Sequence, residues 1–422
     1  MCRRYRAIKT LRLAPIALLI AFLVTGGAAF AAPVAAPASG IEASAPTQKN
    51  EFPTQVVFTL HAQSGADIVK ATLSFKQAGQ ATTTISHPEF APAKEVDLRY
   101  VWDLQRYYSP PGVNIEYYWL LEDAAGQKLR TDPTTFALDD VRFTWQEVND
   151  GPVHIYWYEG DQAFAAKLLD AGKGALDQLS QDAGVETDLP LKVFIYANQK
   201  DLLGGLQPSA QEWAGGTAFP DERVVVAAVE PTSSGLDYGL RVLPHELSHV
   251  VVYAMTKNPY GDIPRWLDEG LAMYAEGELE SGYKDALNEA IRLNGLISVQ
   301  SLSANFPSDP RAAYLSYAQS YSLVKYLIGQ YGSDGLAKLL ANFKEGATYD
   351  GALQATFGVD TEGLDAAWRQ SAGAQAAPAL VAATPQPPSQ PALSASDLRA
   401  IVVALAIGAF VVFLLVRRRR QA

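Results

Sequence analysis

The sequence predicts a multidomain protein in which an all-β domain precedes an α+β domain, with an apolar segment near each end of the chain. Between Phe52 and about Phe143, apolar and polar residues alternate in short runs, a pattern typical of strands. After Val141, strand-like runs are interspersed with longer stretches of helical spacing. At 422 residues, 48% of them hydrophobic and 19% charged, the chain is long enough for two globular domains with flanking segments.

The first domain, predicted over residues 51–143, has the pattern of a small antiparallel β-sandwich. Gly, Pro and Asp separate its apolar runs, as they do between strands joined by turns. The segment 111–126 is similar to the late hairpin of an immunoglobulin-like or fibronectin-like module. Its aromatic residues have two interpretations, a ligand-binding face or core and cross-strand pairs. The clearest apolar runs are Val56, Phe58 and Leu60; Ala71, Leu73 and Phe75; and Ile115, Tyr117, Trp119 and Leu121.

The second domain, predicted over residues 144–370, combines strands with helices. Asn258-Pro259 is a pair that ends helices, and Pro264 is favoured in a first helical turn, so two helices flank this break. The predicted strands are 153–158, 191–196 and 224–228, and the predicted helices are 163–179, 239–258, one that begins at Pro264, 313–330 and 334–343.

The first of the two flanking helices contains His245 and His249, which are four residues apart. On a helix of 3.6 residues per turn, their imidazoles project from one face, where one metal ion can bind both. Glu246 points to the neighbouring face, from which it can reach a water molecule on the metal without being a ligand. The spacing therefore predicts two ligands and the general base of a zinc hydrolase. The alternative is a pair of ordinary surface or core histidines.

A catalytic zinc ion usually has three protein ligands, so a third donor is expected nearby. The other histidines, His61, His87 and His154, lie far upstream. A carboxylate is therefore the expected donor. Glu269 follows His249 by twenty residues and lies in the second helical pattern, whose apolar positions would bury its other side. It is the best candidate for the third ligand.

His-Glu-Leu-Ser-His followed by Trp-Leu-Asp-Glu-Gly-Leu-Ala resembles the gluzincin metallopeptidases, particularly the peptidase MA-like group. The similarity covers roughly residues 190–370. It implies a thermolysin-like α+β fold and one Zn²⁺ per chain. By this resemblance the zinc ligands are His245, His249 and Glu269, and Glu246 activates the water.

The resemblance implies two further roles. In gluzincins, the strand ahead of the active-site helix lies at a sheet edge over the cleft, where an extended peptide can pair with it. The run 224–228 takes this role by resemblance, and the alternative is an ordinary core strand. Related gluzincins also place a tyrosine downstream as a donor to the oxyanion. Tyr317 is the candidate among Tyr314, Tyr317 and Tyr321, with core packing as the alternative.

The N-terminal residues predict export. Residues 1–31 have a basic start, an apolar run and small residues near Ala31, the pattern of a cleaved signal peptide, with an uncleaved anchor helix as the alternative. Residues 32–50 and 371–396 are rich in Ala and Pro and poor in bulky apolar residues, so we expect a linker and a stalk. The only cysteine, Cys2, lies within the signal, so no disulfide is expected.

A second apolar segment, 398–416, predicts a transmembrane helix that is followed by a basic tail, 417–422. Residues 400–416 carry no charge and are just long enough to cross a bilayer, and the four arginines after them would stay in the cytoplasm. We therefore expect a single-pass type I protein of the cell membrane, with its catalytic domain outside the cytoplasm. A buried core helix is the alternative.

Charge and motifs together define the expected partners. Residues 32–396 carry 24 Lys+Arg against 44 Asp+Glu, a net charge of −20, which argues against nucleic acid. The sequence predicts a membrane-anchored zinc metallopeptidase that acts on a peptide or protein substrate. The Gly-x-Met-Glu-Asn motif of aminopeptidase gluzincins is absent from the sequence, which favours an endopeptidase or an enzyme with an unusual substrate. Two alternatives stay open: a catalytically silent surface protein that binds through its β-sandwich, and an enzyme that acts on cell-wall peptide.

Overall fold

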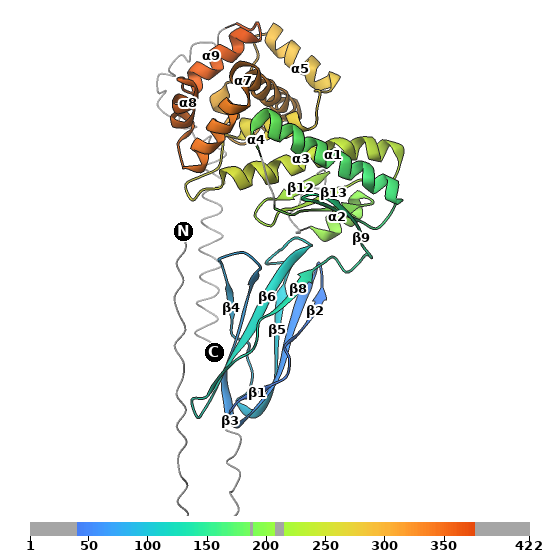
Figure 1. The fold of residues 1–422 in the computed structure, drawn as a ribbon, viewed down its shortest axis with the longest axis vertical. Coiled ribbons are helices and arrows are strands. Elements are labelled where there is room, and N and C mark those ends of the chain that lie inside the picture. Colours follow the sequence, from blue (N-terminus) through green and yellow to red (C-terminus); the bar gives the residue numbers. More distant parts are fainter. Residues whose placement is uncertain (1–39, 186–188, 207–214, 376–422) are drawn as a thin grey trace, which may run out of the picture. The chain divides into compact units, whose positions relative to one another are not determined.

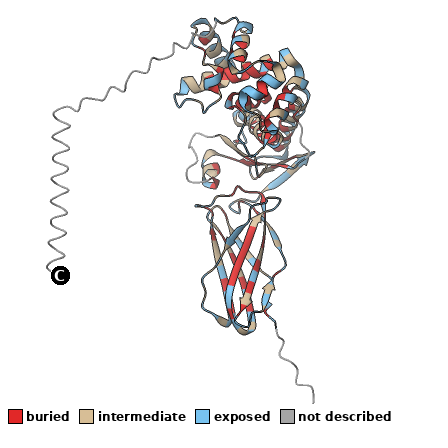
Figure 2. Ribbon diagram, turned by 90° about the vertical axis from the view of Figure 1, so that its left-hand side faces the viewer, coloured by how far each residue is buried: buried red, intermediate tan, exposed pale blue. Residues whose placement is uncertain are grey.

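The computed structural model describes residues 40–185, 189–206 and 215–375, which divide into two compact units (Figure 1). The first unit is largely β-sheet and the second is rich in helices. Both units contain many buried residues, which are drawn in red in Figure 2. The first unit consists of the described residues before Phe52, Gln55–Trp102 and Asn114–Ala137, and the second consists of Phe52–Thr54, Asp103–Val113 and the described residues from Leu138 onward.

The first unit is an antiparallel β structure. β3 pairs with β1, β2, β4, β5 and β6, and β6 also pairs with β7 and β8. Its strands are β1 (Glu42–Ala43), β2 (Thr47–Glu51), β3 (Gln55–Gln77), β4 (Thr84–Ser86), β5 (Ala93–Asp103), β6 (Val113–Asp123), β7 (Lys128–Arg130) and β8 (Thr134–Leu138).

The long strand β3 folds back on itself. On a straight strand, which rises about 3.3 Å per residue, Phe58 and Phe75 would be roughly 55 Å apart. Their ring centroids are 5.4 Å apart. The two halves of β3 therefore lie in facing layers, with β1 and β2 paired to the first half and β4 and β6 paired to the second. This is the sandwich that the alternating pattern predicts, with both layers joined in one sheet through β3.

The apolar positions of the sandwich are buried as predicted. Phe58, Tyr117 and Trp119 are fully buried, and the rings of Phe58 and Tyr117 meet edge to face at 4.9 Å. Tyr117 and Trp119 of the 111–126 segment are therefore core residues, whereas Tyr118 is half-buried on the other face of the strand, with the guanidinium of Arg130 4.1 Å from its ring centroid. β6 and β7 form the predicted hairpin, and the carboxylate of Asp123 closes its turn by accepting a hydrogen bond from the backbone N–H of Gln127.

The predicted linker over residues 32–50 is wrong from about residue 41 onward. Ile41 is buried, and β1 pairs with β3 so that Glu42 lies opposite Gln63. β2 pairs with β3 in the same antiparallel sense. Main-chain hydrogen bonds to β3 hold these strands, so they need few bulky side chains, and composition alone therefore does not reveal them.

The segment Asp103–Val113, predicted within the β domain, belongs to the second unit. The hydroxyl of Tyr108 donates a hydrogen bond of 3.0 Å to the carbonyl oxygen of Gly205. Gly112 lies so close to the ring of Phe194 that a Cβ there would be 2.4 Å from it. An alternating pattern identifies strands, but it does not show which core the loop between two strands will join.

The second unit contains a five-stranded mixed sheet in the order β12-β13-β11-β10-β9. β10, β11 and β13 are parallel, and the two edge strands are antiparallel to their neighbours. The run 224–228, predicted as the edge strand, is β13 and lies between β12 and β11, so that prediction is wrong. The edge is β12, whose residues are all half-buried and so give no alternating pattern. The strands are β9 (Gln146–Asp150), β10 (Val153–Trp157), β11 (Leu191–Tyr196), β12 (Gly216–Phe219) and β13 (Val224–Ala228).

Helices pack around this sheet and extend beyond it. α3 begins before the predicted Gly239 because the side chain of Thr232 accepts a hydrogen bond from the backbone N–H of Gly235 and caps it. The two predicted helices 313–330 and 334–343 are confirmed as the two parts of α7, which meet at Gly332, a residue with non-helical backbone angles. The helices are α1 (Gln162–Ala183), α2 (Gln199–Gly205), α3 (Ser233–Thr256), α4 (Arg265–Ala275), α5 (Ser281–Arg292), α6 (Val299–Leu302), α7 (Pro310–Lys344), α8 (Tyr349–Phe357) and α9 (Thr361–Ser371).

Within the described ranges, no helix combines the length and the apolar composition that a membrane span requires. The predicted signal 1–31, the transmembrane segment 398–416 and the tail 417–422 lie outside these ranges, as does the predicted stalk from residue 376 onward.

Candidate metal centre

Helix α3 carries the first three candidate residues. Leu243, Leu247 and Val250 are buried in the main core of the second unit and fix one face of the helix. The face beside it presents His245 and His249, one turn apart, as the four-residue spacing predicts. Their ring centroids are 4.9 Å apart.

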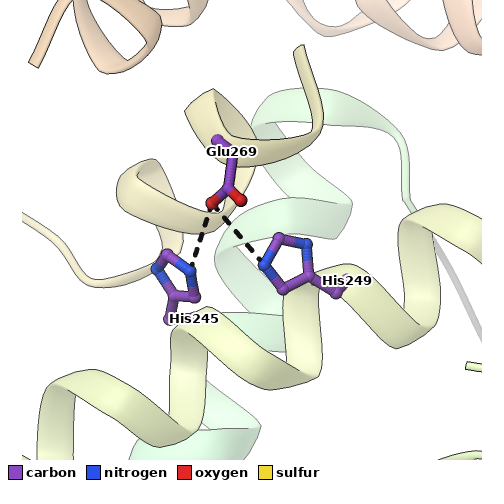
Figure 3. A group of neighbouring side chains, drawn as sticks. All are labelled: His245, His249 and Glu269. Carbon is purple, nitrogen blue, oxygen red and sulfur yellow. Dashed lines mark ion pairs between the residues drawn. The ribbon is translucent and has the colours of Figure 1, made fainter. Parts of the chain in front are cut away.

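Helix α4 brings Glu269 to the same place. Trp266, Leu267 and Leu271 are buried and hold this helix against its neighbours. Gly270 lets α4 lie close to α7, since a Cβ there would be 2.5 Å from the carbonyl oxygen of Ser320. Glu269, next to Gly270, is only 2% exposed. The short α4 thus holds a buried carboxylate opposite the two imidazoles (Figure 3).

The three side chains converge on one point. Oε2 of Glu269 lies 3.4 Å from Nε2 of His245 and 3.7 Å from Nε2 of His249. Two atoms that each lie about 2.1 Å from a tetrahedral zinc ion are about 3.4 Å apart. Oε2 is buried and, within the described part of the chain, has no hydrogen bond of acceptable geometry. A buried carboxylate oxygen in this condition is costly unless a cation binds it, so these residues fit a zinc ion.

A second carboxylate orients each imidazole through its Nδ1 atom. Nδ1 of His245 lies 2.8 Å from Oε1 of Glu276, and Nδ1 of His249 lies 3.0 Å from Oδ1 of Asp268. An ionised carboxylate only accepts hydrogen bonds, so both Nδ1 atoms donate. Both Nε2 atoms therefore face Glu269, and in the neutral tautomer each offers a lone pair, as metal-binding histidines do.

The electrostatics of the site favour a cation. Burial alone would lower the pKa of His245, but the carboxylates of Glu269 and Glu276 raise it to about 10. Burial opposes the charge of Glu269, yet the neighbouring histidines and Arg265 hold its pKa at about 2. The ionised carboxylates thus attract positive charge to the point where the three side chains meet, and a divalent cation can supply it.

Glu246 lines the cavity next to the three converging side chains. Burial raises its pKa, although the two histidines act in the opposite direction. Edge strand β12 approaches it closely, since a Cβ on Gly216 would lie 3.1 Å from Cγ of Glu246. The cavity has a volume of about 730 Å³ and is lined by β12, α3, the start of α4 and Tyr317 of α7.

The structure distinguishes the three tyrosines of the predicted 313–330 helix. Tyr317 lines the cavity. Tyr314 stacks on Tyr283 with ring centroids 3.8 Å apart, and Tyr321 is buried near Tyr274. Of the three, Tyr317 is thus the one that lines the cavity, and its role as a donor to the oxyanion stays a prediction.

The sequence analysis did not identify four charged residues of the site. Asp268 immediately precedes Glu269, and Glu276 follows it by seven residues, which is two helical turns, so spacing alone contained a signal for both. Arg265 pairs with Glu269, and Arg241 pairs with Glu276 at 3.9 Å. Spacing also marks these arginines, because each lies four residues before a candidate ligand on the same helix.

Residues 171–374 match the Peptidase MA superfamily. This range contains α3, α4 and α7, and hence every residue of the candidate site. No curated protein matches the sequence.

Several solved structures share weak similarity with the chain. An aminopeptidase N family protein from Idiomarina loihiensis is 9% identical over 75% of this chain and 70% of its own, with a TM-score of 0.30. A polysaccharide deacetylase from Bacillus cereus is 10% identical over 49% of this chain and 78% of its own, with a TM-score of 0.21. OgpA from Akkermansia muciniphila is 9% identical over 25% of this chain and 32% of its own, with a TM-score of 0.19. These scores are too low to carry an argument.

Proposed function

We propose that this protein is a zinc metallopeptidase in which His245, His249 and Glu269 hold one Zn²⁺ and Glu246 is the general base. One observation carries the proposal. The buried Oε2 of Glu269 lacks a hydrogen bond among the described residues and faces Nε2 of both histidines on the wall of a large cavity. The match of residues 171–374 to the Peptidase MA superfamily supports the same activity.

A zinc ion held by His245, His249 and Glu269 would lower the pKa of a water molecule and polarise a substrate carbonyl. Glu246 then takes a proton from the attacking water and passes it to the leaving amine. Burial raises the pKa of Glu246, which favours protonation of its carboxylate by the water and thus its later action as an acid. Tyr317 lines the same cavity as a neutral hydroxyl, since burial and the charge of Glu269 raise its pKa to about 12, and it donates a hydrogen bond to the oxyanion.

An extended peptide chain is the substrate that suits the cavity. Strand β12 ends the sheet order, and its residues Gly216, Thr217 and Ala218 line the cavity. A sheet edge offers main-chain donors and acceptors to an added strand. The peptide therefore lies along β12, the role that the sequence had assigned to the run 224–228. Because the sequence lacks the aminopeptidase motif, the enzyme cleaves within chains.

The location of the enzyme follows from the sequence. The apolar segment 398–416 and the arginines after it suit a single transmembrane helix, and residues 1–31 suit a signal peptide. In this arrangement the catalytic domain lies outside the cytoplasm, tethered to the cell membrane.

The test compares the full chain in detergent with its Glu246→Gln variant, using an unstructured protein as substrate and mass spectrometry of the products. We expect internal cleavage by the wild type and a loss of about 10²- to 10⁴-fold in the variant, which should keep its zinc. Glu289→Gln, an exposed change on α5, is the matched control and should cleave like the wild type. Equal cleavage by Glu246→Gln, or a zinc-loaded wild type that cleaves no peptide, would favour the binding-protein alternative.

A further inference from the structure

The candidate site contains an arginine to which the proposed reaction assigns no role. Arg265 is the first residue of α4, one helical turn before Glu269, and its Nη2 pairs with Oε1 of that carboxylate. Its side chain is 44% exposed and lines the cavity, whereas Glu269 is only 2% exposed. The guanidinium thus reaches from the cavity wall to a buried candidate ligand.

This contact makes the two oxygens of Glu269 unequal. Oε1 is paired with the guanidinium, while Oε2 has no hydrogen bond among the described residues and faces both histidines. A free carboxylate can bind a metal ion through either oxygen or through both. With Oε1 held by a charge-assisted contact, Oε2 alone is presented to the metal.

Arg265 also lies near the tyrosine of the cavity. Both side chains line the cavity, and the charge of Arg265 lowers the pKa of the Tyr317 hydroxyl against the effect of burial. The ring of Phe306 lies 6.0 Å from the guanidinium carbon and meets the ring of Tyr317 edge to face at 5.2 Å. A guanidinium carries five N–H donors in a planar fork, so it can act on a carboxylate and a hydroxyl at the same time. A lysine ammonium on a flexible stem would hold two such groups less rigidly.

We infer that Arg265 is a positioning residue that couples the metal site to Tyr317. It holds Oε1 of Glu269 so that Oε2 alone binds the metal, and through its charge and the ring of Phe306 it positions Tyr317 on the same cavity wall. A simple helix-stabilising pair between residues 265 and 269 would require neither an Oε2 without a hydrogen bond nor the link to Tyr317 through Phe306. The inference rests on the proposed function, because it assigns a role within that site.

The metal part is tested on the full chain in detergent by Zn²⁺ competition with a chelator and by the visible spectrum of the Co²⁺-substituted protein. Arg265→Ala should weaken Zn²⁺ binding by about 10- to 100-fold and change the Co²⁺ spectrum, because Glu269 can then turn both oxygens to the metal. Arg265→Lys should recover part of the affinity. Arg292→Ala is the matched control, because it removes an exposed arginine that pairs with Glu289 on α5, and its Zn²⁺ affinity and Co²⁺ spectrum should equal those of the wild type.

The coupling to Tyr317 is tested by peptide hydrolysis at saturating zinc. Tyr317→Phe should bind Zn²⁺ like the wild type and lower kcat more than it raises KM. In the Arg265→Ala or Arg265→Lys background the same change should lower kcat much less, because Tyr317 is no longer held in place. Circular dichroism identifies a variant that does not fold, and Arg265→Lys then replaces Arg265→Ala in both tests.

The outcomes separate this inference from the proposed function. A wild-type chain that binds no zinc would refute the proposed function and the inference with it. A wild type that binds zinc while Arg265→Ala keeps the wild-type affinity and Co²⁺ spectrum would refute the inference alone. Independent effects of the Arg265 and Tyr317 changes on kcat would overturn the coupling.

Discussion

Replacing Gly270 with alanine should damage both the fold and the metal site. A Cβ at this position would lie 2.5 Å from the carbonyl oxygen of Ser320 and 2.6 Å from a methyl carbon of Val324, about 0.9 Å short of the 3.4 Å at which ordinary contact begins. The α7 backbone cannot rotate away as a side chain would, so α4 must move away from α7. Overpacking of this kind costs about 1–3 kcal/mol.

The retreat of α4 should also weaken metal binding, because Glu269 is the next residue along the chain. A displacement of about 0.9 Å is nearly half of a zinc–ligand bond of about 2.1 Å. Zinc affinity, measured by chelator competition, should therefore fall by about tenfold or more, and the urea midpoint should fall with it. Gly329→Ala is the matched control, since a Cβ there meets nothing within 4 Å on α7, and it should stabilise by about 0.5–1 kcal/mol. A Gly270→Ala chain with wild-type stability and zinc affinity would refute the close packing of α4 on α7.

Three further predictions concern other contacts. Asp268→Asn weakens the acceptor behind His249, so zinc affinity in a chelator competition should fall by about 10- to 100-fold while the circular dichroism spectrum stays unchanged. Phe58→Ala removes a fully buried ring that packs between the layers of the sandwich, and urea unfolding should show a loss of about 3–5 kcal/mol in that unit. A hydrogen bond from Ser64, together with backbone N–H groups, lowers the pKa of Asp123, so the stability it contributes is present above about pH 4 and is lost as the pH falls through the folded-state pKa. Asp123→Asn should therefore destabilise the sandwich at pH 7 and much less at pH 3, as urea unfolding at the two pH values would show; an equal loss at both would contradict this.

The sequence predicted the parts of the fold in which local pattern and burial coincide. Phe58, Leu73 and Tyr117 stand on alternating positions and are buried in the sandwich. The strand 191–196 was predicted to the residue, because a run of apolar residues with buried neighbours on both faces is visible in the sequence alone. His245 and His249 converge because helical geometry follows directly from a four-residue spacing.

The parts that were missed depend on contacts between distant segments. β12 is too short and too evenly half-buried to give a pattern, and it is the edge strand only because Gly216 pairs with Ala227 of β13. β1 and β2 are held by hydrogen bonds to β3, which the composition of residues 32–50 does not show. The role of Arg265 depends on Tyr317, which comes from another helix, α7, and lines the same cavity.

The zinc content of the purified full chain tests the central claim most directly. Elemental analysis after metal-replete purification should find about one zinc per chain in the wild type and almost none in His245→Ala. His154→Ala is the matched control, because His154 lies on β10 beside Glu147, away from the candidate site, and its zinc content should equal that of the wild type. A wild type without zinc, or a His245→Ala chain that retains it, would contradict the account.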